Sequence, residues 1–178
     1  LIHNNKEQAI KLAQDVVTKF YELYHQNWIS GMRSKLGIFN EEGEDEKLIQ
    51  ELLNIMYKNN EDYTNAFIKL TFNKSEDTMM YESTEFKKWH IKWQERLLRQ
   101  NQSKEESFQL MRSSNPALIP RNHRVEEALS AADEKGDYSV MERLVSLLSK
   151  PFAHTNEQAE YAELPPQSFC NYKTYCGT

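Results

Sequence analysis

The chain is poor in the residues that interrupt or cross-link secondary structure. It has 5 Gly, 5 Pro and 2 Cys in 178 residues. Sandwiches and barrels need many turn-forming residues, so the low Gly and Pro counts favour helices. Cys170 and Cys176 both lie in the last nine residues, a pattern that excludes the disulfide framework of a small secreted protein. A cytoplasmic location is therefore the default expectation.

Long apolar runs and an excess of positive charge are also absent from the sequence. No run approaches the about 20 apolar residues that span a bilayer, so no membrane partner is expected. The 22 basic residues are scattered among 27 acidic ones, and the net charge is −5. An acidic balance gives no general attraction to phosphate backbones, so nucleic acid is disfavoured as a partner.

The chain does contain enough apolar side chains for a real core, since 39% of its residues are hydrophobic and 11% aromatic. We expect a single helical domain over residues 1–178, with a subdivision into 1–102 and 103–178 as the alternative. The first residues, Leu1-Ile2-His3, resemble neither a signal peptide nor an initiating methionine. We therefore expect a piece of a longer polypeptide.

Apolar side chains recur at spacings of three and four, which predicts an all-α fold, an irregular array of about seven helices. The apolar stripes of the first five helices are Ile10, Ala13, Val17, Phe20, Tyr21, Tyr24 and Trp28; Ile49, Leu52, Leu53 and Met56; Tyr63, Phe67 and Leu70; Phe86, Trp89, Trp93 and Leu97; Phe108 and Met111. Gly31 and Gly37 are expected to punctuate a turn, and residues 40–46 to form a solvated acidic loop. Met79-Met80-Tyr81 predicts a loop that packs back onto the core.

Residues 125–148 predict an antiparallel helical hairpin. One face would carry Val125, Ala128, Leu129 and Ala132, and the other Met141, Leu144, Val145 and Leu148. Gly136 fits the left-handed position after the first helix, and Asp137 fits the N-cap of the second. Pro151 would end the hairpin and leave an extended C-terminal tail.

The five histidines give no metal signal, because no two have the i, i+4 spacing that places a pair on one helical face. His90, between two tryptophans, is interpreted as a half-buried packing residue. The segment Arg121-Asn122-His123 follows Pro120 and opens a helix. Its structural interpretation makes Asn122 an N-cap and pairs Arg121 with a carboxylate, and its functional alternative is contact with an anionic ligand.

Cys176 lies three residues from the end, and no base can be named beside it, so nucleophilic catalysis is not predicted. An idle reduced thiol, thiol exchange and anchoring of the tail all stay open. A Cys170–Cys176 bridge would close only a small loop.

From Trp28 onward the chain resembles the C-terminal part of the selenoprotein O family, protein adenylyltransferases with a kinase-like fold. The segments that carry the resemblance are Met32-Arg33-Ser34-Lys35-Leu36-Gly37, Asp62-Tyr63-Thr64-Asn65-Ala66-Phe67, Met111-Arg112-Ser113-Ser114-Asn115-Pro116, Arg121-Asn122-His123, Ala128, Ala131-Ala132, Gly136-Asp137, Leu144, Leu147-Leu148, Pro151-Phe152, Tyr161, Pro165-Pro166 and Tyr175-Cys176-Gly177-Thr178. Their order over about 150 residues makes the match specific.

The resemblance implies a parent enzyme that binds ATP and Mg and transfers AMP to protein hydroxyl groups. Its catalytic and metal-binding motifs would lie upstream, and none maps onto this chain, so no catalytic, cofactor-binding or metal residue is assigned here. Cys176 falls where some members carry selenocysteine, which implies a redox role. The expected partners are the upstream kinase-like core and the parent's protein substrates. The alternative is an independent helical protein-interaction module without enzymatic activity.

Overall fold

The computed structural model describes residues 2–74 and 79–166. Within these ranges it has nine helices and no strand, which confirms the all-α prediction. The helices are α1 (Lys6–Lys35), α2 (Asp45–Lys58), α3 (Tyr63–Phe72), α4 (Met79–Glu82), α5 (Thr84–Leu97), α6 (Lys104–Ser114), α7 (Asn122–Lys135), α8 (Ser139–Leu148) and α9 (Asn156–Tyr161). The two short helices α4 and α9 come in addition to the predicted seven.

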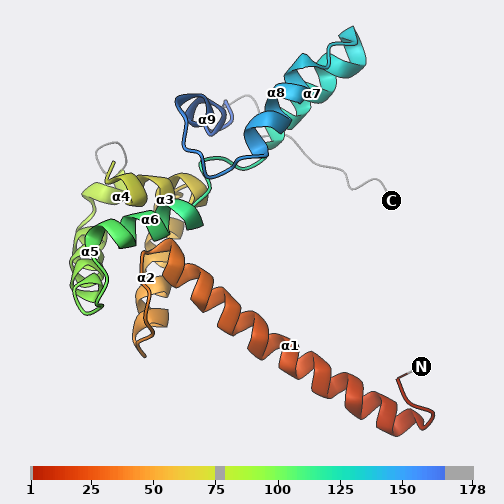
Figure 1. Ribbon diagram of the computed structural model, residues 1–178, viewed down its shortest axis with the longest axis vertical. Coiled ribbons are helices and arrows are strands. Elements are labelled where there is room, and N and C mark those ends of the chain that lie inside the picture. Colours follow the sequence, from red (N-terminus) through yellow and green to blue (C-terminus); the bar gives the residue numbers. More distant parts are fainter. Residues whose placement is uncertain (1, 75–78, 167–178) are drawn as a thin grey trace.

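The molecule has the shape of a C (Figure 1). Helices α2–α6 pack together at its closed side, α1 projects from them as one arm, and α7 and α8 form the other. We call residues 6–27 of α1 the N-terminal arm. The C-terminal arm is residues 122–148, which are α7, α8 and the turn between them, and the central lobe is residues 28–74 and 79–114. The C-terminal lobe is residues 117–164, which include the C-terminal arm and α9.

Helix α1 is longer than the sequence predicted. The Asn5 side chain caps its start by accepting hydrogen bonds from the amides of Glu7 and Gln8. The turn expected at Gly31 is wrong, because the helix continues to Lys35 and the buried Met32 anchors its last turns in the core. The turn expected at Gly37 is present, and its φ of 72° lies in the left-handed region.

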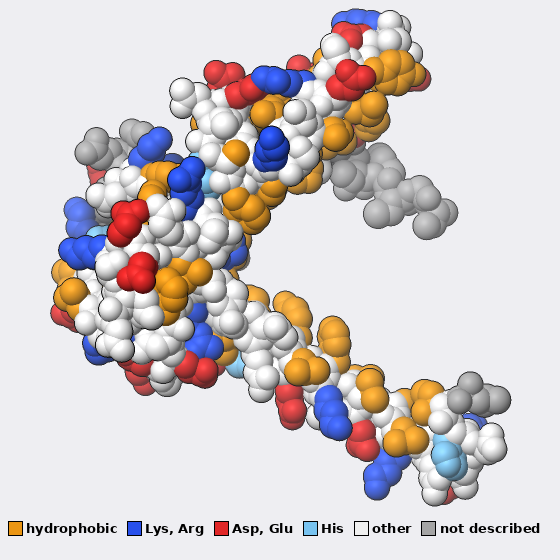
Figure 2. Space-filling model, in the orientation of Figure 1, with side chains coloured by type: hydrophobic (Ala, Val, Ile, Leu, Met, Phe, Trp, Pro, Cys, Tyr) orange, Lys and Arg blue, Asp and Glu red, His pale blue; other side chains and the backbone are white. Residues whose placement is uncertain are grey.

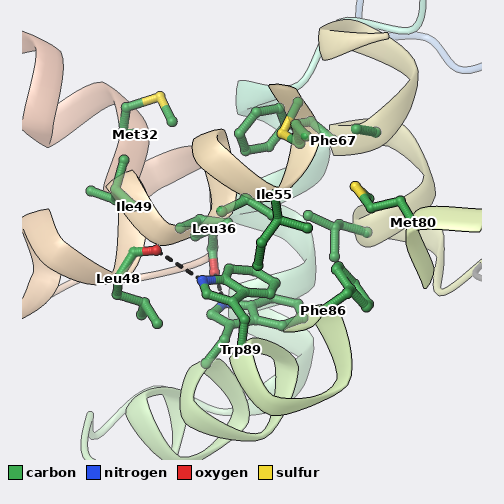
Figure 3. Packing of buried hydrophobic residues seen from close by; sticks show 14 of the residues in the cluster. Met32, Leu36, Leu48, Ile49, Ile55, Phe67, Met80, Phe86 and Trp89 are labelled. Carbon is green, nitrogen blue, oxygen red and sulfur yellow. Dashed lines mark hydrogen bonds between the residues drawn. The ribbon is translucent and has the colours of Figure 1, made fainter. Parts of the chain in front are cut away.

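The central lobe holds the main hydrophobic core, built from the predicted stripes of the second to fourth helices and the end of α1 (Figure 3). Trp89 and Trp93 of α5 are almost fully buried with their rings stacked. The indole N–H of Trp89 donates to the carbonyl of Leu48 at 2.8 Å, and that of Trp93 to the carbonyl of Leu36 at 2.9 Å. These bonds satisfy the polar atoms that the rings carry into the core.

The segment Met79-Met80-Tyr81 packs back onto the core as predicted, although it forms helix α4 and not a loop. Met80 and Tyr81 are buried, and the Tyr81 hydroxyl donates to the carbonyl of Ala66. At the start of α6, Ser103 and Glu106 form a capping box.

The hairpin of α7 and α8 is confirmed, with Gly136 in the left-handed conformation at the end of α7. The N-cap of α8 is Tyr138, one residue later than predicted, although the Asp137 carboxylate accepts the amide N–H of Ser139 at 3.0 Å. Of the two predicted apolar faces only Ala128 and Leu144 are buried, because a two-helix hairpin covers little surface by itself.

Helix α9 corrects the prediction of an irregular tail directly after Pro151. Thr155 and Gln158 form a capping box at its start. The buried Gln158 amide donates to the carbonyls of Leu147 and Lys150, which ties α9 to the end of α8. The rest of the predicted tail, from residue 167, lies outside the described residues.

Candidate functional site

Arg121 joins the two lobes. Its guanidinium donates to both carboxylate oxygens of Asp62, at the start of α3, at 2.7 and 2.8 Å. It also donates to the side-chain oxygen of Asn65 and to the carbonyl of Ala162. Both charged side chains are largely buried. The predicted pairing of Arg121 with a carboxylate is therefore observed.

Asp62 serves two purposes at this junction. Its carboxylate accepts the amide N–H of Asn65 at 2.9 Å and so caps α3, while it also binds Arg121. Burial opposes its ionisation, but hydrogen bonds from Arg121 and Asn65 and the positive charges of Arg121 and Lys69 outweigh this effect. The pKa of Asp62 therefore lies below its ordinary value.

The other predicted residues of this segment do not gather at the junction. Asn122 is exposed and is the first residue of α7, so the predicted N-cap at Asn122 is wrong: Arg121 holds that position, without a side-chain capping bond. His123 is half-buried, and burial together with the positive charges of Arg124 and Arg121 lowers its pKa. Contact of Arg121, Asn122 and His123 with an anionic ligand stays a prediction. Cys176 lies outside the described residues.

Asn115, just before the proline that ends α6, is a second tie between elements. Its buried side-chain amide donates to the carbonyl of Lys35 and to the hydroxyl of Thr71. Its side-chain oxygen accepts from the Lys35 ammonium at 3.3 Å. One side chain thus fixes the ends of α1, α3 and α6 relative to one another, which indicates a structural role.

The acidic segment 40–46 contributes Asp45 to a buried ion pair that the sequence pattern does not indicate. Asp45 was expected in a solvated loop, but it is 2% exposed and binds Arg96 of α5 at 2.6 Å. Arg96 also donates to the side chain and carbonyl of Asn40. Nothing in the spacing of Asp45 sets it apart from its acidic neighbours, because its partner is 51 residues away.

Grooves that involve α3 lie beside the core. One, of about 620 Å³, is lined by parts of α5 and α6, including His90, Trp93 and Met111. His90 is half-buried there, and its ring contacts those of Phe86 and Trp93, which confirms it as a packing residue. Another, of about 290 Å³, lies between α3 and α9.

The described residues do not form a recognisable metal or membrane site. Among residues 2–74 and 79–166, no three His, Cys, Asp or Glu side chains are placed to hold a metal ion. None of the helices in the same ranges is both long and apolar enough to cross a membrane.

Both arms carry exposed apolar side chains. On the N-terminal arm, the predicted stripe is uncovered: Val17, Phe20 and Tyr21 are each 67–70% exposed. The C-terminal arm exposes Leu129, Tyr138 and Val145. In Figure 2, hydrophobic side chains gather along the edge of each arm that faces the space between them. These features define a helical protein whose core elements are joined by buried hydrogen bonds and ion pairs, and whose two arms expose apolar side chains.

Comparisons with known proteins identify this helical unit. The family described as "Protein adenylyltransferase SelO" matches residues 5–149. Proteins named "Protein nucleotidyltransferase YdiU" match the whole chain, at 59% identity in Clostridium botulinum (strain Okra / Type B1), 56% in Alkaliphilus metalliredigens (strain QYMF) and 53% in Brevibacillus brevis.

The chain belongs to the SelO family, which confirms the resemblance seen in the sequence. It spans 36% of the length of each of these relatives.

Proposed function

We propose that this chain is the helical part of a protein nucleotidyltransferase that moves AMP from ATP to hydroxyl groups of protein side chains. The observation that supports this is its identity of 53–59%, over all 178 residues, to relatives named as protein nucleotidyltransferases. The kinase-like catalytic region, the ATP and Mg site and the protein substrates belong to the same proposal, and they rest on the family resemblance.

Within that enzyme, we assign this chain a supporting role. We assign none of the described residues to the ATP and Mg of that enzyme, and the guanidinium of Arg121 is bound to Asp62. No chemical step is therefore derived from them. The described residues supply a packed core and two arms, and the exposed apolar sides of the arms can contact a catalytic region.

Transfer of labelled AMP tests this proposal. A family polypeptide that contains this chain is incubated with Mg²⁺, an acceptor protein and ATP labelled in the α-phosphate. We expect label on the protein with the longer polypeptide and none with the 178-residue chain alone. No label with either, or label with the short chain alone, would contradict the proposal.

Calorimetry with ATP gives a second, independent readout. The 178-residue chain is expected to give no heat of binding at micromolar ATP. Tight ATP binding by this chain alone would place the nucleotide site here and contradict the supporting role.

The proposal extends to Cys176 as a regulatory thiol, because the family resemblance places it where some members carry selenocysteine. Its thiol and a second cysteine thiol in the catalytic region would form a disulfide. Two electrons and two protons would pass to an oxidant such as glutathione disulfide, which is reduced to two thiols. Loss of redox-dependent AMP transfer in a Cys176→Ser variant would support this role, and unchanged redox dependence would contradict it.

An independent interaction module is the competing function. Exposed apolar faces alone suit either function. The comparisons give no support to the module, so the enzyme is preferred.

A further inference from the structure

The N-terminal arm is an amphipathic helix whose apolar side is exposed within the part of the chain that the structure describes. Successive residues of an α-helix turn by about 100°, so Ile10, Val17, Phe20, Tyr21 and Tyr24 fall within an arc of roughly 100°. Lys11, Asp15, Lys19 and Glu22 fall on the opposite side. Such a helix normally buries its apolar side. Here its hydrophobic side chains between residues 10 and 24 are mostly half or more exposed.

The side chains of this face are typical of a protein interface. Phe20 and Tyr24 stack with their ring centroids 6.4 Å apart, and Tyr21 stacks on His25 at 6.3 Å. Tyr and Phe are enriched at protein interfaces, because each adds a large rigid contact area with few rotatable bonds. Between residues 10 and 24 the acidic and basic residues lie outside this arc.

The two arms face the same space. Figure 2 shows hydrophobic side chains along the inner edge of both arms, with the central lobe closing the space at one end. On the C-terminal arm, Tyr138, Met141 and Val145 are exposed. Their spacing of three and four places them on one side of α8 and its N-cap. One body between the arms would cover both apolar faces.

The length of the relatives fits one occupant of that space. Since 178 residues make up 36% of each relative, about 320 residues of each lie outside the match. A folded domain of that size has a radius of gyration of about 20 Å and hence a diameter of about 50 Å. The N-terminal arm, residues 6–27 of α1, is about 33 Å long, so it lies along about two thirds of the width of such a domain.

We infer that the two arms form a clamp that grips the remaining about 320-residue part of the same family polypeptide from two sides. This inference rests on the proposed function, since that part would be the catalytic region. A covalently linked region has an effective concentration of the order of millimolar, so it covers the arms in preference to a second copy at micromolar concentration.

Photo-cross-linking in the full family polypeptide tests the clamp. We would make Phe20→p-benzoylphenylalanine on the N-terminal arm and Val145→p-benzoylphenylalanine on the C-terminal arm. Thr18→p-benzoylphenylalanine is the matched control, because Thr18 is an exposed residue on the charged side of α1. For each of the two arm variants we expect a cross-linked product of monomer mass, in which position 20 or position 145 is joined to a peptide outside these 178 residues. The control at position 18 should give at least tenfold less product.

Several outcomes would overturn the clamp: products of twice the monomer mass, links from one arm to the other, a product at only one of the two arms, or no excess over the control. Because mapping of cross-links does not depend on catalysis, the two proposals can fail separately. Links at both arms without AMP transfer would contradict only the proposed activity. AMP transfer without links would contradict only the clamp.

Discussion

The central lobe and the N-terminal arm have the same sequence pattern and opposite surroundings. Phe86, Trp89 and Trp93 recur at helical spacing and are at most 4% exposed. Val17, Phe20 and Tyr24 recur in the same way and are at least 60% exposed. The pattern therefore determines that a segment is an amphipathic helix, and the surrounding chain determines whether its apolar side is covered. An uncovered stripe in an otherwise packed protein indicates a missing partner.

The sharpest test of this comparison exchanges one aromatic ring in each region for alanine. Trp89→Ala removes a buried ring and its bond to the Leu48 carbonyl, so we expect a loss of about 3–5 kcal/mol in the free energy of unfolding. Phe20→Ala in the same 178-residue chain should change it by less than about 0.5 kcal/mol. Urea denaturation of both variants measures the difference, and equal losses would contradict it.

A smaller effect is expected at the tie between the lobes. Arg121→Ala removes the two hydrogen bonds to Asp62 and should cost about 2 kcal/mol of unfolding free energy, because bonds to charged groups contribute roughly 1.5–3 kcal/mol. The more exposed pair of Arg143 and Glu157 is the control, and Arg143→Ala should cost less than about 1 kcal/mol.

The contribution of Arg121 should also depend on pH. The pKa of Asp62 is lowered in the folded chain, so this stability is fully present above the ordinary Asp value of about 3.9 and is lost as the pH falls through the lower folded value. The difference between the unchanged chain and Arg121→Ala should therefore shrink below about pH 4. Denaturation at a series of acidic pH values measures the unfolding free energies of both chains. A difference between them that stays constant as the pH falls would contradict this assignment.

The smallest effects concern the glycines where the arm joins the central lobe. Gly31 is helical with open space around it, so Gly31→Ala should raise the unfolding free energy by about 0.5–1 kcal/mol. Gly37 has a φ of 72°, and a Cβ there would lie 2.9 Å from the Ser107 carbonyl oxygen. Gly37→Ala should therefore lower the unfolding free energy by more than about 1 kcal/mol. Thermal unfolding of both variants would show shifts of opposite sign, and shifts of the same sign would contradict this.

The sequence predicts those features that local chemistry determines. Helical spacing and the left-handed Gly136 act within a few residues, and both predictions are confirmed. The capping boxes Ser103–Glu106 of α6 and Thr155–Gln158 of α9 are equally local signals.

Long-range features were not predictable in the same way. Asp45 and Arg96 are 51 residues apart, and Arg121 and Asp62 are 59 apart. Spacing within one helix contains no information about such partners, so Asp45 was assigned to a solvated loop and the partner of Arg121 could not be named. For the same reason the sequence could identify the stripe of α1 but not its exposure.

Hydrogen exchange of the α1 amides tests most directly whether the rest of the family polypeptide covers the N-terminal arm. Exchange of residues 10–24 would be measured in the 178-residue chain and in the full polypeptide under the same conditions. We predict fast exchange in the short chain and exchange at least tenfold slower in the full polypeptide, because docking buries the apolar side and suppresses fraying. Equal rates in the two would contradict the account.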